Sequence, residues 1–264
     1  MPNLNRDSTS IHYERRGSGS AIVFLHSFLS DNTHFRHQIS ALEKTHLVLA
    51  IDTRGHGRSS AATEKFTIYD LLDDAIAVLD AEGVGSAVWV GHSLGGFVAM
   101  RAALNHPERV SGLVLIGTEA GSQSLQKRAQ DLGLKWVLRT FGPQFISPLI
   151  AKTMFGKTTQ RVNPALVRSY RESFADMQVG SICHCIDAVG RRDDVLSRLR
   201  EIQCPTLVVV GDEDIPLPPS KSRMIATRVH GASLTIIVGA GHLCPVEKPV
   251  EVTAMLLSFV GELQ

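Results

Sequence analysis

The stretch that decides the fold reads Ala87-Val88-Trp89-Val90-Gly91-His92-Ser93-Leu94-Gly95-Gly96. Its apolar start predicts a buried strand, and a helical pattern begins at Leu94. A serine on so tight a turn is strained, and side chains two residues away would collide with backbone, so glycine is needed at 91 and 95. The turn predicts Ser93 as a nucleophile at a helix N-terminus, where amide groups favour negative charge. The alternative is an ordinary turn that packs a helix on a sheet.

Apolar runs rich in Val, Ile and Leu alternate with longer helical patterns on both sides of this turn. This alternation is typical of buried parallel strands joined by crossover helices. The sequence therefore predicts an α/β fold with a mostly parallel sheet flanked by helices. The expected strands are 11–15, 21–26, 47–52, 87–91, 110–117, 206–211 and 234–238, and the expected helices are 32–42, 68–81, 94–105, 219–229 and 246–263.

The alternation stops between Glu119 and Arg200, where a long helical pattern is broken at Gly142-Pro143, Ser147-Pro148 and Asn163-Pro164. The strand pattern then resumes at Thr206. We therefore expect one core domain in two parts, residues 1–118 and 201–264, split by an inserted helical cap over residues 119–200.

A serine hydroxyl needs a base to accept its proton and an acid to orient that base. Two later strands end in suitable groups, the first in Asp212-Glu213-Asp214 and the second in Gly239-Ala240-Gly241-His242. Open α/β sheets place their sites in loops at the carboxyl ends of strands. His242 is the predicted base and Asp214 the preferred acid, with Asp212, Glu213 and Glu119 as open alternatives.

The composition limits the range of functions. The net charge of +1 gives no reason to expect a nucleic-acid partner, and no apolar run is long enough to span a membrane. Residues 1–10 lack the apolar segment of a secretory signal, so we expect a cytoplasmic protein without a membrane partner. Its four cysteines are scattered, and the spacing of Cys183-His184-Cys185 differs from that of zinc sites, so no metal is expected.

Residues 120–200 carry 13 Lys and Arg against 6 Asp and Glu. This excess is suited to steering an acidic substrate, although solvated helix faces would give the same composition. Five aromatic residues of this segment are candidates for an apolar substrate pocket, or for contacts that hold the helices together. They are Trp136, Phe141, Phe145, Phe155 and Phe174.

From about Ile11 to its end, the chain resembles the α/β-hydrolase superfamily. The resemblance rests on His26-Ser27-Phe28-Leu29, on Asp52-Thr53-Arg54-Gly55-His56-Gly57-Arg58-Ser59, and on 91–96, 211–214 and 239–242. It implies the acid at Asp214 and oxyanion-hole N–H groups at Phe28 and Leu94.

Ser27 replaces the family's usual glycine. Its Cβ restricts positive φ, and its hydroxyl is expected in the substrate pocket together with Trp136. We expect His26 and His56 to tie neighbouring loops together.

His-Ser-x-x combined with Asp-Thr-Arg-Gly-His-Gly is similar to bacterial 3-oxoadipate enol-lactonases. This resemblance implies hydrolysis of a small carboxylic ester or lactone through an acyl-enzyme, without a metal or organic cofactor. Esterases and cofactor-free haloperoxidases share most of these segments, so perhydrolysis is an alternative. A ligand receptor with slow turnover is another. Haloalkane dehalogenases and epoxide hydrolases are disfavoured, because they have Asp where Ser93 stands.

Overall fold

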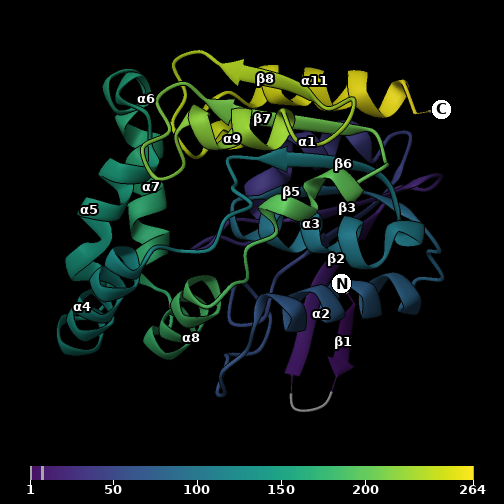
Figure 1. The fold of residues 1–264 in the computed structure, drawn as a ribbon. Coiled ribbons are helices and arrows are strands. Elements are labelled where there is room, and N and C mark those ends of the chain that lie inside the picture. The colour runs from purple at the N-terminus through teal and green to yellow at the C-terminus, as the bar shows by residue number, and fades with distance from the viewer. Residues whose placement is uncertain (1, 7–8, 264) are drawn as a thin grey trace.

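The computed structural model describes residues 2–6 and 9–263. Within them, an eight-stranded sheet has the order β1-β2-β4-β3-β5-β6-β7-β8 (Figure 1). β2 pairs antiparallel with β1 and β4, and the neighbours from β4 to β8 are parallel. The strands are β1 (Asn3–Arg6), β2 (Thr9–Arg16), β3 (Ala21–Leu25), β4 (Leu47–Ile51), β5 (Ala87–His92), β6 (Val110–Ile116), β7 (Thr206–Gly211) and β8 (Ser233–Ile237). The predicted mostly parallel α/β architecture is confirmed.

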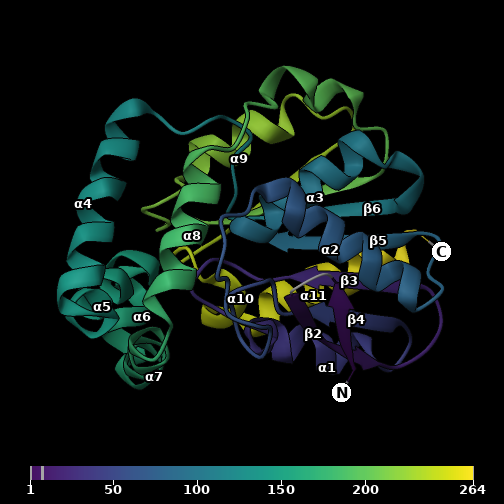
Figure 2. The same cartoon turned by 90° about the horizontal axis from the view of Figure 1, so that it is seen from below.

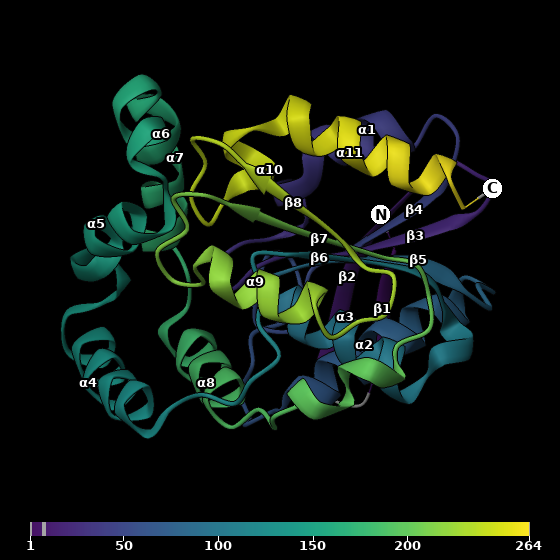
Figure 3. The same cartoon turned by 45° about the horizontal axis from the view of Figure 1, so that its top comes forward.

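Helices cover both faces of the sheet, because alternate strand residues point to opposite sides. In β3, Val23 and Leu25 belong to the apolar core shared with α2, α3 and α9, whereas Ile22 and Phe24 belong to the core shared with α1 and α11. Figure 3 shows these two sets of helices on opposite faces. The helices are α1 (Arg36–Leu42), α2 (Ile68–Ala81), α3 (Leu94–Asn105), α9 (Pro219–Ala226) and α11 (Pro249–Gly261).

The segment between β6 and β7 forms a separate set of helices, here called the α4–α8 layer. In Figures 1 and 2 it lies beside the sheet, and Figure 1 shows that the arrowheads of β6 and β8 point toward it. Its apolar core includes Phe155 and Phe174 and extends to Leu29, after β3, and Leu243, after β8. The helices are α4 (Leu125–Phe141), α5 (Pro143–Met154), α6 (Lys157–Val162), α7 (Pro164–Ala175) and α8 (Val179–Gly190).

Two sequence-based expectations about these elements were wrong, and one strand was missed. The helix expected over 246–263 is divided into α10 (Cys244–Glu247) and α11, because the ring of Pro249 disfavours a helical conformation at Lys248, which has φ −133° and ψ 59°. The break expected at Ser147-Pro148 is absent, since Pro148 lies inside α5 and the Ser147 hydroxyl donates to the Gln144 carbonyl that Pro148 leaves unpaired. The polar edge strand β1 was not predicted.

None of the helices between residues 2 and 263, apart from the undescribed 7–8, is both long and apolar enough to span a bilayer.

Candidate active site

Ser93 lies at the turn between β5 and α3 with φ 51° and ψ −106°, a left-handed conformation that non-glycine residues rarely adopt. The surrounding glycines allow this turn. A Cβ on Gly91 would lie 2.3 Å from the Gly95 carbonyl oxygen, and a Cβ on Gly95 would lie 2.0 Å from that of Leu25. The requirement for glycine at both positions is therefore confirmed.

The loop after β3 lies directly against the start of α3, because the Gly95 N–H donates to the His26 carbonyl at 3.1 Å. The N–H groups of Phe28 and Leu94 therefore belong to adjoining segments, and neither donates to an acceptor in the described part of the chain. The left-handed residue of the loop is Leu29, with φ 60°, so Ser27 does not need the positive φ that its Cβ would resist. The Ser27 side chain is fully buried.

His26 ties two loops together, as the sequence predicted. Its Nε2 accepts a 3.0 Å hydrogen bond from the Thr53 N–H, so its Nδ1 carries the proton and donates to the Ser27 carbonyl at 2.7 Å. The loop that carries Phe28 is thereby held against the loop after β4.

His242 and Asp214 form a buried pair. His242 Nδ1 lies 2.8 Å from Asp214 Oδ2, and Asp214 Oδ1 accepts a 2.9 Å hydrogen bond from the Leu217 N–H. Both side chains are almost completely excluded from solvent. Both oxygens of the Asp214 carboxylate are therefore held in place. Because a carboxylate oxygen accepts the hydrogen bond, the imidazole proton of His242 lies on Nδ1, and Nε2 is left as an acceptor.

The three alternative acids have other partners. Asp212 accepts from the Gly239 N–H at 2.7 Å, and Glu213 accepts from the N–H and hydroxyl of Thr158 at 2.8 and 2.6 Å. Glu119 forms ion pairs with Arg192 and, at 2.8 Å, with Lys221. Of the four candidates, the structure therefore places only Asp214 in hydrogen-bonding contact with His242.

Two histidines that the sequence did not single out also contact this site. His92 Nε2 lies 2.8 Å from the His242 carbonyl oxygen, and His92 Nδ1 lies 2.9 Å from His34 Nε2. The only available signal was the position of His92, immediately before Ser93. A Cβ on Gly117 would lie 3.2 to 3.3 Å from Asp214 Oδ2, His242 Nδ1 and His92 Nε2, so these three atoms surround one point at the end of β6.

The α4–α8 layer contacts the His242 loop through its backbone. The His242 N–H donates to the Met154 carbonyl at 2.8 Å. Glu247 joins the same two segments, since its carboxylate oxygens accept from the N–H groups of Gly241 and Gly156, each at 2.9 Å. Burial raises the pKa of Glu247, although these hydrogen bonds act in the opposite direction. The loop that carries His242 is therefore fixed to the layer.

The five aromatic residues proposed from the sequence for a pocket or for helix contacts fall into two groups. Phe155 and Phe174 are buried in its apolar core, whereas Trp136, Phe141 and Phe145 are exposed and contact one another through their rings. Trp136 is 63% exposed. Of the two alternatives that the sequence left open, contacts between helices fit Phe155 and Phe174, whereas the exposure of the other three residues does not fit one buried pocket lined by all five.

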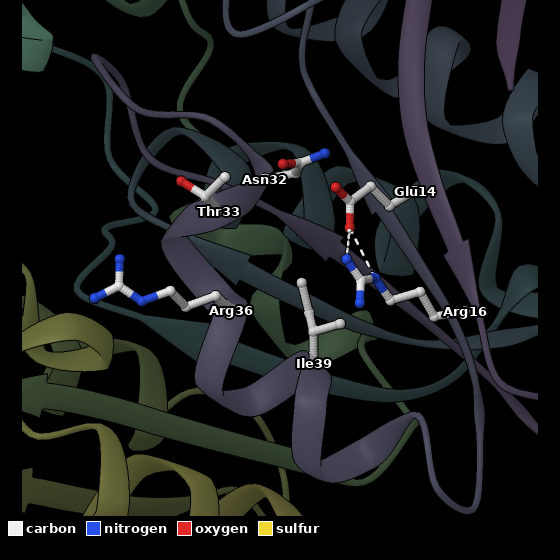
Figure 4. Close-up of a pocket in the computed structure, with 6 residues that line it drawn as sticks. All are labelled: Glu14, Arg16, Asn32, Thr33, Arg36 and Ile39. Atoms are coloured by element: carbon white, nitrogen blue, oxygen red, sulfur yellow. Dashed lines mark hydrogen bonds and ion pairs between the residues drawn. The ribbon is translucent and has the colours of Figure 1, made fainter. Parts of the chain in front are cut away.

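A pocket of about 140 Å³ lies elsewhere in the molecule, between β2 and α1 (Figure 4). The ion pair of Arg16 with Glu14, at 2.8 Å, lies along one side of it. Ser93, His242 and Asp214 are not among its lining residues, which are Glu14, Arg16, Asn32, Thr33, Arg36 and Ile39.

Cys183 and Cys185 are buried in α8. No group of three or more His, Cys, Asp or Glu residues in the described ranges is arranged to hold a metal ion.

The Ser93 turn, the buried His242–Asp214 pair and the sheet order can be compared with known proteins. The sequence model of the family described as alpha/beta hydrolase fold matches residues 20–249. The chain belongs to this family. The α/β-hydrolase resemblance of the sequence is thereby confirmed, and the α4–α8 layer lies between β6 and β7 of an α/β-hydrolase sheet.

Individual known proteins match the chain over nearly its whole length. A non-heme haloperoxidase of Rhodococcus erythropolis is 30% identical over 268 residues, which cover 96% of this chain and 97% of that protein. The structure of a Thermogutta terrifontis esterase with malate bound superposes with a TM-score of 0.94 at 25% identity, covering 100% and 99% of the two chains. An enol-lactonase from Burkholderia xenovorans LB400 has a TM-score of 0.91 at 25% identity, covering 98% and 100%.

Proposed function

We propose that this chain hydrolyses a small carboxylic ester or lactone through an acyl-enzyme on Ser93. The observation that carries the proposal is the buried 2.8 Å contact between His242 Nδ1 and Asp214 Oδ2, in a fold where Ser93 occupies a strained turn at the start of α3. A carboxylate at Nδ1 holds the imidazole in the tautomer whose Nε2 accepts a proton, and it stabilises the imidazolium that then forms.

In the proposed first half-reaction, His242 Nε2 accepts the Ser93 proton while Oγ attacks the carbonyl carbon. The N–H groups of Phe28 and Leu94 stabilise the tetrahedral oxyanion, and each such donor contributes about 3 kcal/mol to the transition state. The ester bond then breaks, and the leaving alkoxide takes the proton from His242. In the second half-reaction His242 removes a proton from water, which attacks the acyl carbon, and gives that proton to Ser93 Oγ as the carboxylic acid leaves.

We also propose that residues 119–200 act as a cap over this site. Support comes from the apolar core that the α4–α8 layer shares with Leu29 and Leu243, which follow β3 and β8. The excess of seven positive charges in residues 120–200, from 13 Lys and Arg against 6 Asp and Glu, favours a substrate that carries a carboxylate. The name of the related enol-lactonase is compatible with an ester or lactone substrate.

A set of p-nitrophenyl esters and lactones, assayed on the purified protein, tests this function. Ser93→Ala is expected to abolish turnover while circular dichroism stays unchanged. A fluorophosphonate should label Ser93 in the wild type, as located by peptide mass spectrometry. Ser86→Ala, at an exposed serine before β5, is the matched control and should keep full activity. Undiminished turnover by Ser93→Ala would contradict the mechanism.

Perhydrolysis is a second candidate, favoured by the 30% identity with the Rhodococcus erythropolis haloperoxidase. In that reaction hydrogen peroxide replaces water in the second half-reaction, and a peracid leaves the same acyl-enzyme. The ratio of peracid to carboxylic acid formed in the presence of peroxide distinguishes the two activities. Ser93→Ala should abolish both products, and peracid formation that persists in this variant would exclude the acyl-enzyme route.

A further inference from the structure

A short chain of buried histidines ends on the backbone of the proposed base. His34 lies in the 3₁₀ turn Asn32–Phe35 before α1, and His92 is the last residue of β5. Their rings stack with centroids 4.7 Å apart and an interplanar angle of 14°, and the ring of His92 lies 4.9 Å from that of His242. The side chains of His34 and His92 are almost fully excluded from solvent.

The protons of this chain can be assigned from the acceptor at its end. The His242 carbonyl oxygen only accepts, so the 2.8 Å contact requires a proton on His92 Nε2. A neutral imidazole carries one proton, which leaves His92 Nδ1 as the acceptor in its 2.9 Å contact with His34 Nε2. His34 must therefore donate from Nε2, and its Nδ1 has no hydrogen-bond partner among the described residues. Each tautomer thus sets the next.

The two histidines are held in the neutral state. Burial lowers the pKa of His34 to about 3, and the nearby His26 and His242 add to this effect. Burial, His34 and His242 hold the pKa of His92 well below its ordinary value. The neutral state of this pair favours the proposed proton transfer, because a positive charge on His92 would destabilise the imidazolium that His242 forms.

We propose that His92 is a positioning residue that holds His242 in place through its main-chain carbonyl, and that His34 fixes the tautomer His92 needs. This inference rests on the proposed function, in which His242 is the base. His242 is held through three of its own groups: its N–H by Met154, its Nδ1 by Asp214 and its carbonyl by His92. Loss of the contact with His92 leaves the carbonyl without its donor and allows the His242 loop to move.

His92→Gln and His92→Leu separate this role from simple packing. The glutamine amide can donate to the His242 carbonyl and accept from His34, whereas leucine fills a similar volume without either group. We expect His92→Leu to lower kcat by about tenfold or more, because small displacements of a catalytic group are costly. KM should change by less than about twofold, and His92→Gln should recover most of the lost rate, since its amide restores the positioning contact.

Two further measurements do not depend on substrate. The rate at which a fluorophosphonate labels Ser93 should fall in His92→Leu in parallel with kcat. The downfield proton resonance of His242 Nδ1–H should be sharp in the wild type and in His92→Gln, and shifted or broadened in His92→Leu. His34→Leu removes the donor to His92 Nδ1 and should cause a smaller change in the same direction, which provides a test if His92→Leu does not fold.

His12→Leu is the matched control. His12 is also buried, with Nδ1 bonded to Asn3 at 2.9 Å on the β1–β2 edge, and it has no place in the proposed machinery. This variant should lose stability without losing kcat. A kcat for His92→Leu within twofold of the wild type, or equal losses for His92→Leu and His92→Gln, would overturn the inference. Failure of the proposed function would give a different result from failure of this inference. The wild type would then turn over no ester, while the His242 Nδ1–H resonance would still differ between the wild type and His92→Leu.

Discussion

The N–H of His242 donates a 2.8 Å hydrogen bond to the carbonyl of Met154, the last residue of α5. The backbone of the proposed base is thus joined directly to the α4–α8 layer. Gly241 brings the two segments together, because a Cβ at this position would lie 2.2 Å from the Gly156 nitrogen and 2.6 Å from the Phe155 carbonyl carbon. The position of His242 therefore depends on the layer as well as on the sheet.

We predict that Gly241→Ala lowers both thermal stability and kcat, since the new methyl group meets backbone atoms that cannot rotate away. Gly133→Ala is the matched control. Gly133 lies in α4, and a Cβ there would meet no atom within 4 Å. Alanine should stabilise this helix by about 0.5–1 kcal/mol. Thermal melts and ester assays of the two variants provide the test, and a Gly241→Ala enzyme with normal kcat would argue against coupling between layer and base.

Glu247→Ala should weaken the same connection from the other side. It leaves the buried N–H groups of Gly156 and Gly241 without their acceptor, which costs about 1–3 kcal/mol of unfolding free energy. Glu247→Gln keeps one acceptor oxygen and should lie between Ala and the wild type. Urea denaturation measures these differences. Glu251→Ala, at an exposed position on α11, should leave both stability and kcat unchanged.

The ion pair between Arg101 and Asp193 predicts an acid-sensitive part of the stability. Burial tends to raise the pKa of Asp193, but hydrogen bonds and charge from the almost fully buried Arg101 outweigh it, and the net pKa lies below its ordinary value. A carboxyl with a lowered pKa in the folded state stabilises that state above its unfolded pKa. This stabilisation is lost as the pH falls through the folded value, below about pH 4.

Asp193→Asn should therefore be less stable than the wild type at pH 7, and the difference should narrow toward pH 3. The Asp193 side chain is 44% exposed, so solvent screening keeps the effect modest. Thermal melts at a series of pH values measure it. A difference between the two proteins that stays constant from pH 7 to pH 3 would show that the Asp193 charge does not contribute.

Ser27→Ala tests the residue that replaces the family's usual glycine. The Ser27 Oγ is buried and has no hydrogen-bond partner in the described part of the chain. We expect the variant to gain up to about 1 kcal/mol of unfolding free energy, because an unpaired buried hydroxyl is costly. Its KM for an ester should be unchanged. A KM that rises several-fold would instead support the sequence-based prediction that this hydroxyl reaches the substrate.

Much of the fold follows from local sequence signals. The predicted bounds of β7, α2 and α3 agree with the structure, because apolar runs, helical periodicity and a capping box at Thr67 are local. The proline at 249 was also visible, yet the expected helix ran through it, and the polar strand β1 has no apolar pattern to reveal it. Exposure of Trp136 depends on how α4 packs on its neighbours, which periodicity does not determine.

The sequence by itself determined the strained turn at Ser93, the glycines it requires, and the order in which nucleophile, acids and histidine follow their strands. Tertiary structure decided which acid meets His242, and that His92 and His34 approach it. Asp214 and His242 are 28 residues apart, whereas His92 and His242 are 150 apart. They meet because the order β3-β5-β6-β7-β8 brings the carboxyl ends of distant strands to one edge of the sheet, and no local pattern encodes that pairing.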